Sequence, residues 1–329
     1  MGKTGGKILV TGADGFIGSH LVEALARRGF HVRAFVQYNA RNQWGWIEDI
    51  SKEIFQAVEI FPADLRDSFA VKKAVSGCQV VMHLGALIAI PYSYTAPQDY
   101  IQTNIIGTLN VLQASLEVGV EQVIHTSTSE TYGTAQYVPI NEGHPLTGQS
   151  PYSASKIGAD KIAESYYLSY ALPVTILRPF NTYGSRQSAR AVIPTIITQA
   201  FAEKNIHLGS LGPIRDLTFV EDTVQGFLMS LGKPEGVGET INLGYGKGIS
   251  VGDLAKKILS IMKIEKKIIE DTQRIRPEKS EVQRLISDNR KAAKILGWKP
   301  QTSLEEGLQT TIEWFSSHLD LYKSHIYNQ

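Results

Sequence analysis

KILVTGADGFIGSH, residues 7–20, is the stretch that decides the fold. Its first part, Lys7–Gly12, is a short apolar run typical of a buried strand, and a helical pattern follows through Arg28 to Gly29. Glycines at positions 12, 15 and 18 let the intervening backbone approach a pyrophosphate, while the helix N-terminus offers N–H groups and partial positive charge. A tight structural turn is the plainer alternative, but strand–glycine–helix order is what a dinucleotide-binding unit requires.

Strands and helices alternate along the rest of the first 180 residues. Short apolar runs predict further strands at His31–Val36, Val58–Leu65, Cys78–Ala86, Glu121–Ser129 and Pro173–Pro179. Helical patterns lie between them, such as Tyr100–Val118 and Ala154–Tyr170. This alternation predicts an α/β fold of Rossmann type, with a doubly wound parallel sheet.

Beyond Pro179 the elements become shorter, and glycines and prolines interrupt them. Val251–Met262 and Ser303–Leu319 have helical patterns. We expect residues 1–180 to form the dinucleotide-binding domain, with 216–247 returning to it. Residues 181–215 and 248–329 are then expected to form a smaller α/β lobe that binds the substrate.

Composition limits the partners and the location of the chain. The net charge of +1 over 329 residues gives no general attraction to nucleic acid or to an anionic membrane. No apolar run is long enough to cross a bilayer, and the N-terminus leads directly into a strand, so a signal peptide is not expected. Cys78 is the only cysteine, and no spacing of His, Asp and Glu indicates a metal site. These features predict a cytoplasmic protein without a metal centre.

The choice between NAD and NADP is left open by the second strand. A carboxylate at the end of that strand usually holds the ribose 2′-hydroxyl, but here the strand ends at Val36 and Gln37 with no acid. Arg41 lies nearby, so a 2′-phosphate would not be repelled, and NAD is only slightly favoured. Asp64 and Leu65 after the third strand are expected to border the adenine ring, although Asp64 is equally typical of a helix cap.

Two short motifs suggest chemistry at the strand ends. PYSASK places Tyr152 and Lys156 four residues apart at a helix start, so both side chains lie on one face. A cationic lysine beside a phenol favours the phenolate, which would make Tyr152 a base near neutral pH. Upstream, HTSTSETYG (residues 125–133) places Thr128, Ser129 and Glu130 side by side after the fifth strand.

Together these motifs resemble the extended short-chain dehydrogenase/reductase superfamily, in particular its NAD-dependent epimerase/dehydratase family. The resemblance covers nearly the whole chain. It rests on TGADGFIGSH, TNIIGTLNVL, PYSASK, RPFNTYG (178–184), RDLTFVEDTV (215–224) and LGWKP (296–300). It implies a Thr128–Tyr152–Lys156 triad. Together with the motifs themselves, the resemblance leads us to expect that the following residues contact the cofactor: Gly12, Gly15, Phe16, Ile17, Gly18, Gln37, Arg41, Asp64, Leu65, Leu84, Ala86, Asn104, Tyr152 and Lys156.

The resemblance also narrows the reaction. Sugar epimerases of this family usually carry small or apolar residues after the triad hydroxyl, whereas GDP-mannose dehydratases carry Thr-Ser-Glu, as this chain does at Thr128, Ser129 and Glu130. The chain is also similar to bacterial 4,6-dehydratases of UDP- or GDP-linked N-acetylglucosamine, in pathways to nonulosonic acids and deoxyamino sugars. The implied reaction gives a 4-keto-6-deoxy sugar, with Glu130 taking the C5 proton and delivering it to O6.

Two alternatives to the dehydratase give these residues different roles. A nucleotide-sugar 4-epimerase shares the first hydride step but has no use for Glu130, and an NAD(P)-binding sensor has no use for the triad. Glu130 as a capping carboxylate and Ser129 as a turn hydroxyl are the plainer readings of those two side chains. The nucleotide, UDP or GDP, stays open.

Substrate contacts and assembly are also expected by resemblance. Asn181 and Val192 should meet the substrate, and the guanidinium groups of Arg215 and Arg276 suit its diphosphate, with surface ion pairs as the alternative. A homodimer is expected through a four-helix interface built from Tyr100–Val118 and Ala154–Tyr170. His83 and His125 are expected to be structural, and Trp44 and Trp46 to pack.

Overall fold

The computed structural model describes residues 6–324, and its centre is a seven-stranded parallel sheet. The strand order is β10-β6-β5-β4-β1-β2-β3. The strands are β1 (Lys7–Thr11), β2 (His31–Gln37), β3 (Glu59–Ala63), β4 (Val80–His83), β5 (Gln122–Thr126), β6 (Val174–Pro179) and β10 (Thr240–Leu243). The order reverses between β1 and β4, which is where a doubly wound sheet opens a crevice at its carboxyl edge. The predicted Rossmann-type fold is confirmed.

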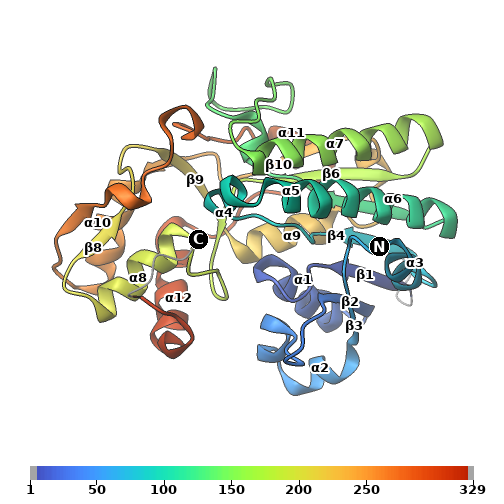
Figure 1. The fold of residues 1–329 in the computed structure, drawn as a ribbon, viewed down its shortest axis with the longest axis horizontal. Helices are drawn as coiled ribbons and strands as arrows, with labels where there is room; N and C mark the ends of the chain where they lie inside the picture. The colour runs from blue at the N-terminus through green and yellow to red at the C-terminus, as the bar shows by residue number, and fades with distance from the viewer. Residues whose placement is uncertain (1–5, 325–329) are drawn as a thin grey trace.

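Helices cover both faces of this sheet (Figure 1). One face carries α1 (Phe16–Arg27), α2 (Lys52–Ala57), α9 (Val220–Ser230) and α11 (Arg290–Leu296), and the other carries α3 (Ser68–Val75), α6 (Gly107–Val118) and α7 (Pro151–Tyr170). Within β1, Ile8 and Val10 pack on the α1 face while Leu9 packs on the α3 face. Because both faces are covered, the strands are continuously apolar, which is why they stood out in the sequence.

Several predicted elements have different boundaries in the structure; the strand predicted over Glu121–Ser129, for example, ends at Thr126, and two further differences bear on the site. The strand predicted over Cys78–Ala86 is hydrogen-bonded only from Val80 to His83, since the residues after His83 leave the sheet to line a cavity. The helix predicted over Tyr100–Val118 is built from α5 (Pro97–Tyr100), a π-helical segment at Ile101–Ile106 and then α6. The short helix α4 (Ile90–Thr95) precedes them. Such π-helical turns disturb the regular ladder and are frequent at functional sites.

The remaining residues form a smaller lobe, on the left in Figure 1. It contains α8 (Val192–Ala202), α10 (Val251–Met262) and α12 (Leu304–Ser316) with two small sheets. These sheets are β11 (Gly248–Ser250), β9 (Ile214–Phe219) and β7 (Asn181–Tyr183), and β12 (Ile268–Glu270) beside β8 (Ile206–Leu208). Its apolar residues share one continuous core with the α1 face of the large sheet. Within the described range, no helix has the length and apolar character needed to cross a membrane.

LGWKP ties this lobe to α9 through Asp222. The buried indole N–H of Trp298 donates to the Asp222 carbonyl at 2.8 Å, and the Asp222 carboxylate accepts the backbone N–H groups of Gln301 and Thr302 at 2.9 and 3.0 Å. These bonds satisfy polar groups that burial would otherwise leave unpaired. The motif therefore fixes where α12 begins relative to the large sheet.

Candidate active site

The turn between β1 and α1 leaves no room for a side chain at Gly12 or Gly18. Gly12 has φ +66°, and a Cβ there would lie 2.8 Å from Cα of Gly85, at the end of β4. A Cβ on Gly18 would lie 2.0 Å from the Gly12 carbonyl oxygen. Helix α1 begins after Gly15 without a side-chain cap, so its first N–H groups are not satisfied by a capping side chain. Glycines at these positions create a cradle of backbone N–H groups suited to a pyrophosphate.

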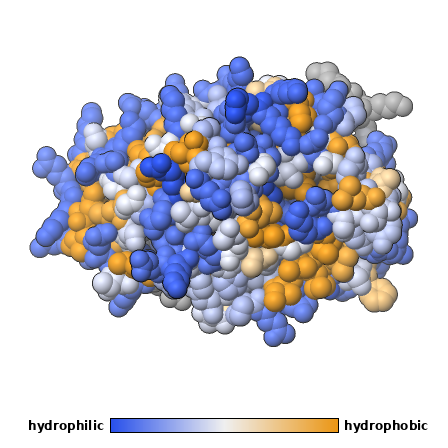
Figure 2. Space-filling view, turned by 90° about the horizontal axis from the view of Figure 1, so that it is seen from above, coloured by the Kyte–Doolittle hydropathy of each residue, from blue (hydrophilic) through white to orange (hydrophobic). Residues whose placement is uncertain are grey.

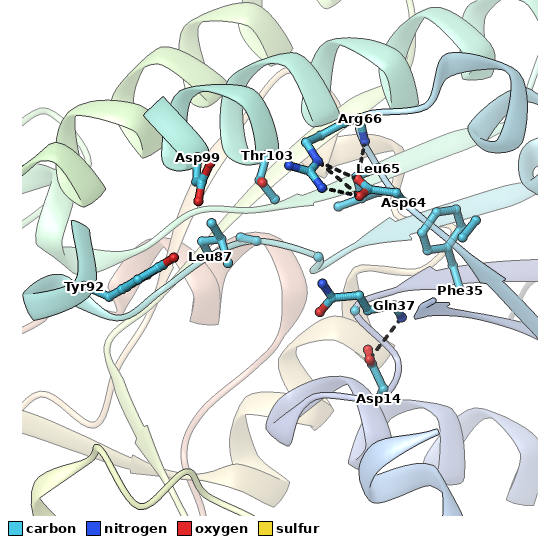
Figure 3. Close-up of a pocket in the computed structure, with 14 residues that line it drawn as sticks. Asp14, Phe35, Gln37, Asp64, Leu65, Arg66, Leu87, Tyr92, Asp99 and Thr103 are labelled. Carbon is cyan, nitrogen blue, oxygen red and sulfur yellow. Dashed lines mark hydrogen bonds and ion pairs between the residues drawn. The ribbon is translucent and has the colours of Figure 1, made fainter. Parts of the chain in front are cut away.

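A cavity of about 300 Å³ opens beside this turn, over the carboxyl edge of the sheet (Figure 3). Five of the expected cofactor contacts line it, namely Gly12, Gln37, Asp64, Leu65 and Ala86. Nine lining residues were not predicted: Asp14, Phe35, Ala63, Arg66, Gly85, Leu87, Tyr92, Asp99 and Thr103. Asp14 and Thr103 belong to the motifs TGADGFIGSH and TNIIGTLNVL, but nothing in those motifs singled them out, and the other seven come from segments without a motif. Gly15, Phe16, Ile17, Gly18, Arg41, Leu84, Asn104, Tyr152 and Lys156 are not among the lining residues.

Asp64 and Asn104 have well-defined partners near the cavity. The Asp64 carboxylate pairs with the Arg66 guanidinium at 2.6 Å, and this hydrogen bond holds the pKa of Asp64 below its usual range. The cap of α3 is Asp67, not Asp64, because Asp67 accepts the N–H of Phe69 at 2.9 Å. The side chain of Asn104 sits in the π-helical segment and bonds the backbone N–H and carbonyl of Leu87, which fixes the loop after β4.

Helix α7 presents the YxxxK pair at its buried start. Ser150 and Ser153 form a reciprocal capping box, and Pro151 occupies the first turn. Tyr152 and Lys156 are both buried. The Lys156 ammonium donates to the Thr126 carbonyl at 2.7 Å, which anchors α7 to the end of β5.

The electrostatics of this pair differ from the sequence-based expectation. Burial raises the pKa of the Tyr152 phenol, a side-chain hydrogen bond with Thr128 lowers it, and the charge of Glu130 raises it. Burial also lowers the pKa of Lys156 to about 8, against the attraction of Asp160. The group that opposes the rise at Tyr152 is therefore the Thr128 hydroxyl, because the lysine is directed at the Thr126 carbonyl instead.

The HTSTSETYG segment brings Glu130 to Tyr152. After β5 the chain forms a 3-10 turn over Ser129–Tyr132, which Thr128 caps by accepting the Glu130 N–H at 3.3 Å. Ser129 and Glu130 are both buried, the latter only 8% exposed. Thr128 and Glu130 thus lie close enough to Tyr152 for the hydroxyl of one and the charge of the other to affect the pKa of the phenol, although their sequence positions span a strand end and a helix start.

A buried polar network lies beneath this point, and sequence reasoning missed it. Asp160 accepts from Arg178 at 2.7 Å and from the Ser127 hydroxyl at 2.5 Å, and lies 3.2 Å from His125 Nε2. Nearby, His83 contacts the hydroxyls of Thr11 and Thr108 at 2.7 and 3.0 Å. Burial lowers the pKa of both histidines, which keeps them neutral. The signal was available, since Asp160 follows Tyr152 and Lys156 at positions i+8 and i+4 on the same helix.

The expected substrate contacts lie in the smaller lobe. Arg215 and Arg276 converge on one carboxylate, Glu281, with nitrogen–oxygen distances of 3.1 and 3.7 Å. Asn181 begins β7, and its side-chain oxygen is buried without a hydrogen-bond partner in the part of the chain that the structure describes. Val192 is the first residue of α8. A paired arginine cluster and an unsatisfied amide oxygen are both features that a polar ligand would complete.

Trp46 does not reach the cavity. Its ring packs against Trp314 of α12 and against Tyr322, at centroid distances of 5.6 and 6.4 Å, respectively. This packing role is the one expected from the sequence. The pair joins the loop after β2 to the C-terminal end of the described chain. The loop's position is therefore determined by residues that lie almost 270 positions away.

Comparison with known proteins relates this architecture to enzymes of sugar nucleotides. A family model described as GDP-mannose 4,6 dehydratase matches residues 9–311. A UDP-glucuronate 4-epimerase of Thermodesulfobacterium geofontis is 33% identical, over 97% of this chain and 99% of its own. A dTDP-glucose 4,6-dehydratase of Streptomyces antibioticus is 30% identical, over 94% of this chain and 92% of its own.

The solved structures agree with the sequence relatives. A dTDP-glucose 4,6-dehydratase of Streptomyces venezuelae with NAD bound has a TM-score of 0.86 at 26% identity, and covers 96% of this chain and 99% of its own. The relatives therefore divide between two activities, dehydration and epimerisation, on one fold.

Proposed function

We propose that this chain, which belongs to the GDP-mannose 4,6-dehydratase family of NAD-dependent nucleotide-sugar dehydratases and epimerases, is itself a 4,6-dehydratase. Its substrate is an NDP-N-acetylglucosamine, with UDP or GDP as the nucleotide. Its products are the NDP-4-keto-6-deoxy sugar and water. The observation that carries the proposal is the buried carboxylate of Glu130, which lies near enough to Tyr152 for its charge to raise the pKa of the phenol.

The cofactor is NAD, and the residues present fit it. Gly12 and Gly18 allow the turn to pack directly against Gly85 and against the start of α1, and the cavity beside this turn is also lined by Phe35 and Gln37 of β2. Gly12, Gly15 and Gly18 would hold the pyrophosphate, and Asp64 and Leu65 would border the adenine. Held there, NAD would supply the redox chemistry, as the acceptor of hydride from C4 of the sugar and its donor to C6.

Tyr152 and Glu130 move the protons. Tyr152 takes the proton of the C4 hydroxyl as the ketone forms, with Thr128 bonded to the phenol. The ketone acidifies the C5–H bond, and Glu130 takes that proton and gives it to the C6 hydroxyl, which leaves as water. Tyr152 then gives up the proton that it took from the C4 hydroxyl, and C5 gains one proton, so the numbers of protons taken and returned are equal. Ser129, whose hydroxyl is too weak an acid for this transfer, helps to orient the carboxylate.

Lys156 and Asp160 support this chemistry from below. The Lys156 ammonium is fixed on the Thr126 carbonyl, one turn along α7 from Tyr152. The Asp160 carboxylate is held ionised by Arg178, and its charge favours the protonated form of Lys156. Asp160 thereby helps Lys156 to keep its proton, although burial favours the neutral amine.

The substrate is proposed to lie between the sheet edge and the smaller lobe. Arg215 and Arg276 would bind its diphosphate in place of, or together with, their contacts to Glu281. Asn181 would bond the sugar, and Val192 would border the nucleotide. Three segments, residues 42–46, 127–142 and 181–197, resemble bacterial 4,6-dehydratases of nucleotide-linked N-acetylglucosamine. The assignment of N-acetylglucosamine rests on this resemblance. So does the proposed role in bacterial glycan, nonulosonic-acid or deoxyamino-sugar synthesis in the cytoplasm.

A homodimer through α6 and α7 is part of the proposal. The two helices pack side by side, and Figure 2 shows that apolar patches are exposed on several parts of the surface seen from above. Exposed apolar side chains on or next to these helices include Ile101, Leu168 and Tyr170. Light scattering on purified protein would test this assembly, and a monomeric mass at micromolar concentration would argue against it.

A nucleotide-sugar 4-epimerase is the second candidate, because epimerases stand among the relatives. Mass spectrometry after incubation with UDP-N-acetylglucosamine and, separately, GDP-N-acetylglucosamine separates the two. The dehydratase gives a product lighter by one water without consuming added NAD. An isomer of unchanged mass would show that the epimerase reading is the correct one.

A further inference from the structure

The end of β2 has an acid after all, but the acid comes from another segment. The strand ends at Gln37, where Rossmann units usually place a carboxylate for the ribose. In the structure the Asp14 carboxylate lies there, and its Oδ2 accepts the backbone N–H of Gln37 at 3.1 Å (Figure 3). Asp14 belongs to the glycine turn TGADG, and both residues line the cavity.

We propose that Asp14 replaces the missing strand-end acid, so that it bonds the adenosine ribose hydroxyls of NAD and excludes the 2′-phosphate of NADP. The inference rests on the proposed function, because it places a dinucleotide in this cavity. It answers the ambiguity that Gln37 and Arg41 leave in the sequence.

The charges around the cavity support exclusion of a phosphate. Three carboxylates line it, those of Asp14, Asp64 and Asp99, against one guanidinium, that of Arg66. That guanidinium already makes a two-point contact with Asp64. A 2′-phosphate would thus bring further negative charge toward an excess of negative charge, with the nearest cation already engaged.

Arg41 is not placed to compensate. Its side chain is exposed, and it is not among the residues that line the cavity. The loop that carries it turns on Asn39, whose side-chain oxygen accepts the N–H groups of Arg41 and Gln43 at 3.0 and 3.3 Å. These bonds fix the backbone at Arg41 within a local turn rather than over the cavity.

The NQWGW segment holds Asp14 in place. The Trp46 N–H donates to the Asp14 carbonyl at 3.1 Å, and a Cβ on Gly45 would lie 2.5 Å from that oxygen. Gly45 also has φ +57°, so glycine is favoured at this close approach. Burial raises the pKa of Asp14, and the Gln37 N–H opposes this by favouring the carboxylate. These contacts fix the position of Asp14, and a residue that determines cofactor specificity needs such a fixed position.

Nucleotide binding tests the proposal without relying on turnover. Nucleotide released from denatured wild-type protein is identified by chromatography, and the Kd values of NAD and NADP are measured by calorimetry after the bound nucleotide has been removed. We expect NAD in the released fraction and a clear preference for NAD in wild type. In Asp14→Asn, which keeps an acceptor for the Gln37 N–H, the preference should fall by about tenfold or more.

Two further variants make the result decisive. Arg41→Gln should leave the NAD/NADP ratio unchanged, and the double variant Asp14→Asn/Gln37→Asp should regain the preference for NAD. An unchanged ratio in Asp14→Asn, or a loss of NADP affinity in Arg41→Gln, would overturn the proposal. Wild-type protein that prefers NADP would also overturn it while leaving the dehydratase intact. Protein that binds neither nucleotide would overturn the proposed function as well.

Discussion

Asp160 and Arg178 form a buried ion pair, with 2.7 Å between the carboxylate and the guanidinium, two helical turns along α7 from Tyr152. Both side chains are about 4% exposed. The pair also receives the Ser127 hydroxyl and adjoins His125, so it connects the ends of β5 and β6 to α7. Removing one partner would leave an uncompensated charge in a place that water does not reach.

Asp160→Asn should therefore destabilise the fold by about 3–5 kcal/mol, measured by chemical denaturation at neutral pH. The pKa of Asp160 is depressed in the folded state by Arg178 and His125, against burial. Its stabilising contribution is thus complete above the ordinary carboxyl pKa and is lost as pH falls toward the folded pKa, so wild type and variant should converge in acid. Glu164→Gln is the matched control, since its exposed pair with Lys161 on the same helix should change stability by less than about 1 kcal/mol.

Glu130→Gln should separate hydride transfer from elimination. Tyr152 and the cofactor site are unchanged, so reduced nicotinamide should still appear on substrate addition. Release of water should slow by about 10²- to 10⁴-fold, because the amide cannot carry the proton. Absorbance of reduced nicotinamide in single turnovers, together with product mass, reports both steps. Ser129→Ala is the control and should retain most of its turnover; full turnover by Glu130→Gln would refute the proton-shuttle role.

The alkaline limb of activity should depend on Lys156. Its pKa is lowered by burial to about 8, so its positive charge is complete below that pH and is lost above it. Turnover should accordingly decline above about pH 8. Because the Asp160 charge raises the pKa of Lys156, Asp160→Asn should shift this limb to lower pH. A pH–rate profile of the folded variant that superimposes on wild type would contradict the coupling.

Sequence reasoning located the strands well because parallel strands buried on both faces are almost wholly apolar, as Leu9 and Val10 show. It also placed residues that follow a strand or share a motif, such as Thr128 and Lys156. It missed Asp160, although its spacing from Tyr152 and Lys156 on one helix was visible, and it missed the partners Arg178 and Glu281, which come from separate elements and leave no local pattern. It judged the end of β2 from the strand's last residues and the nearby Arg41, because a side chain that arrives from the glycine turn cannot be read from that strand's own sequence.

Arg215→Ala should weaken substrate binding far more than the chemical step. Arg215 is largely buried and shares Glu281 with Arg276, so the cluster is preorganised for a diphosphate. Loss of a hydrogen bond to a charged group is worth about 1.5–3 kcal/mol, which corresponds to a rise in KM of roughly 10- to 150-fold. Arg290→Ala removes a guanidinium that is 84% exposed and paired with Asp288, and should leave KM unchanged. Equal effects of the two variants on KM would mean that Arg215 acts through general charge rather than as a diphosphate contact.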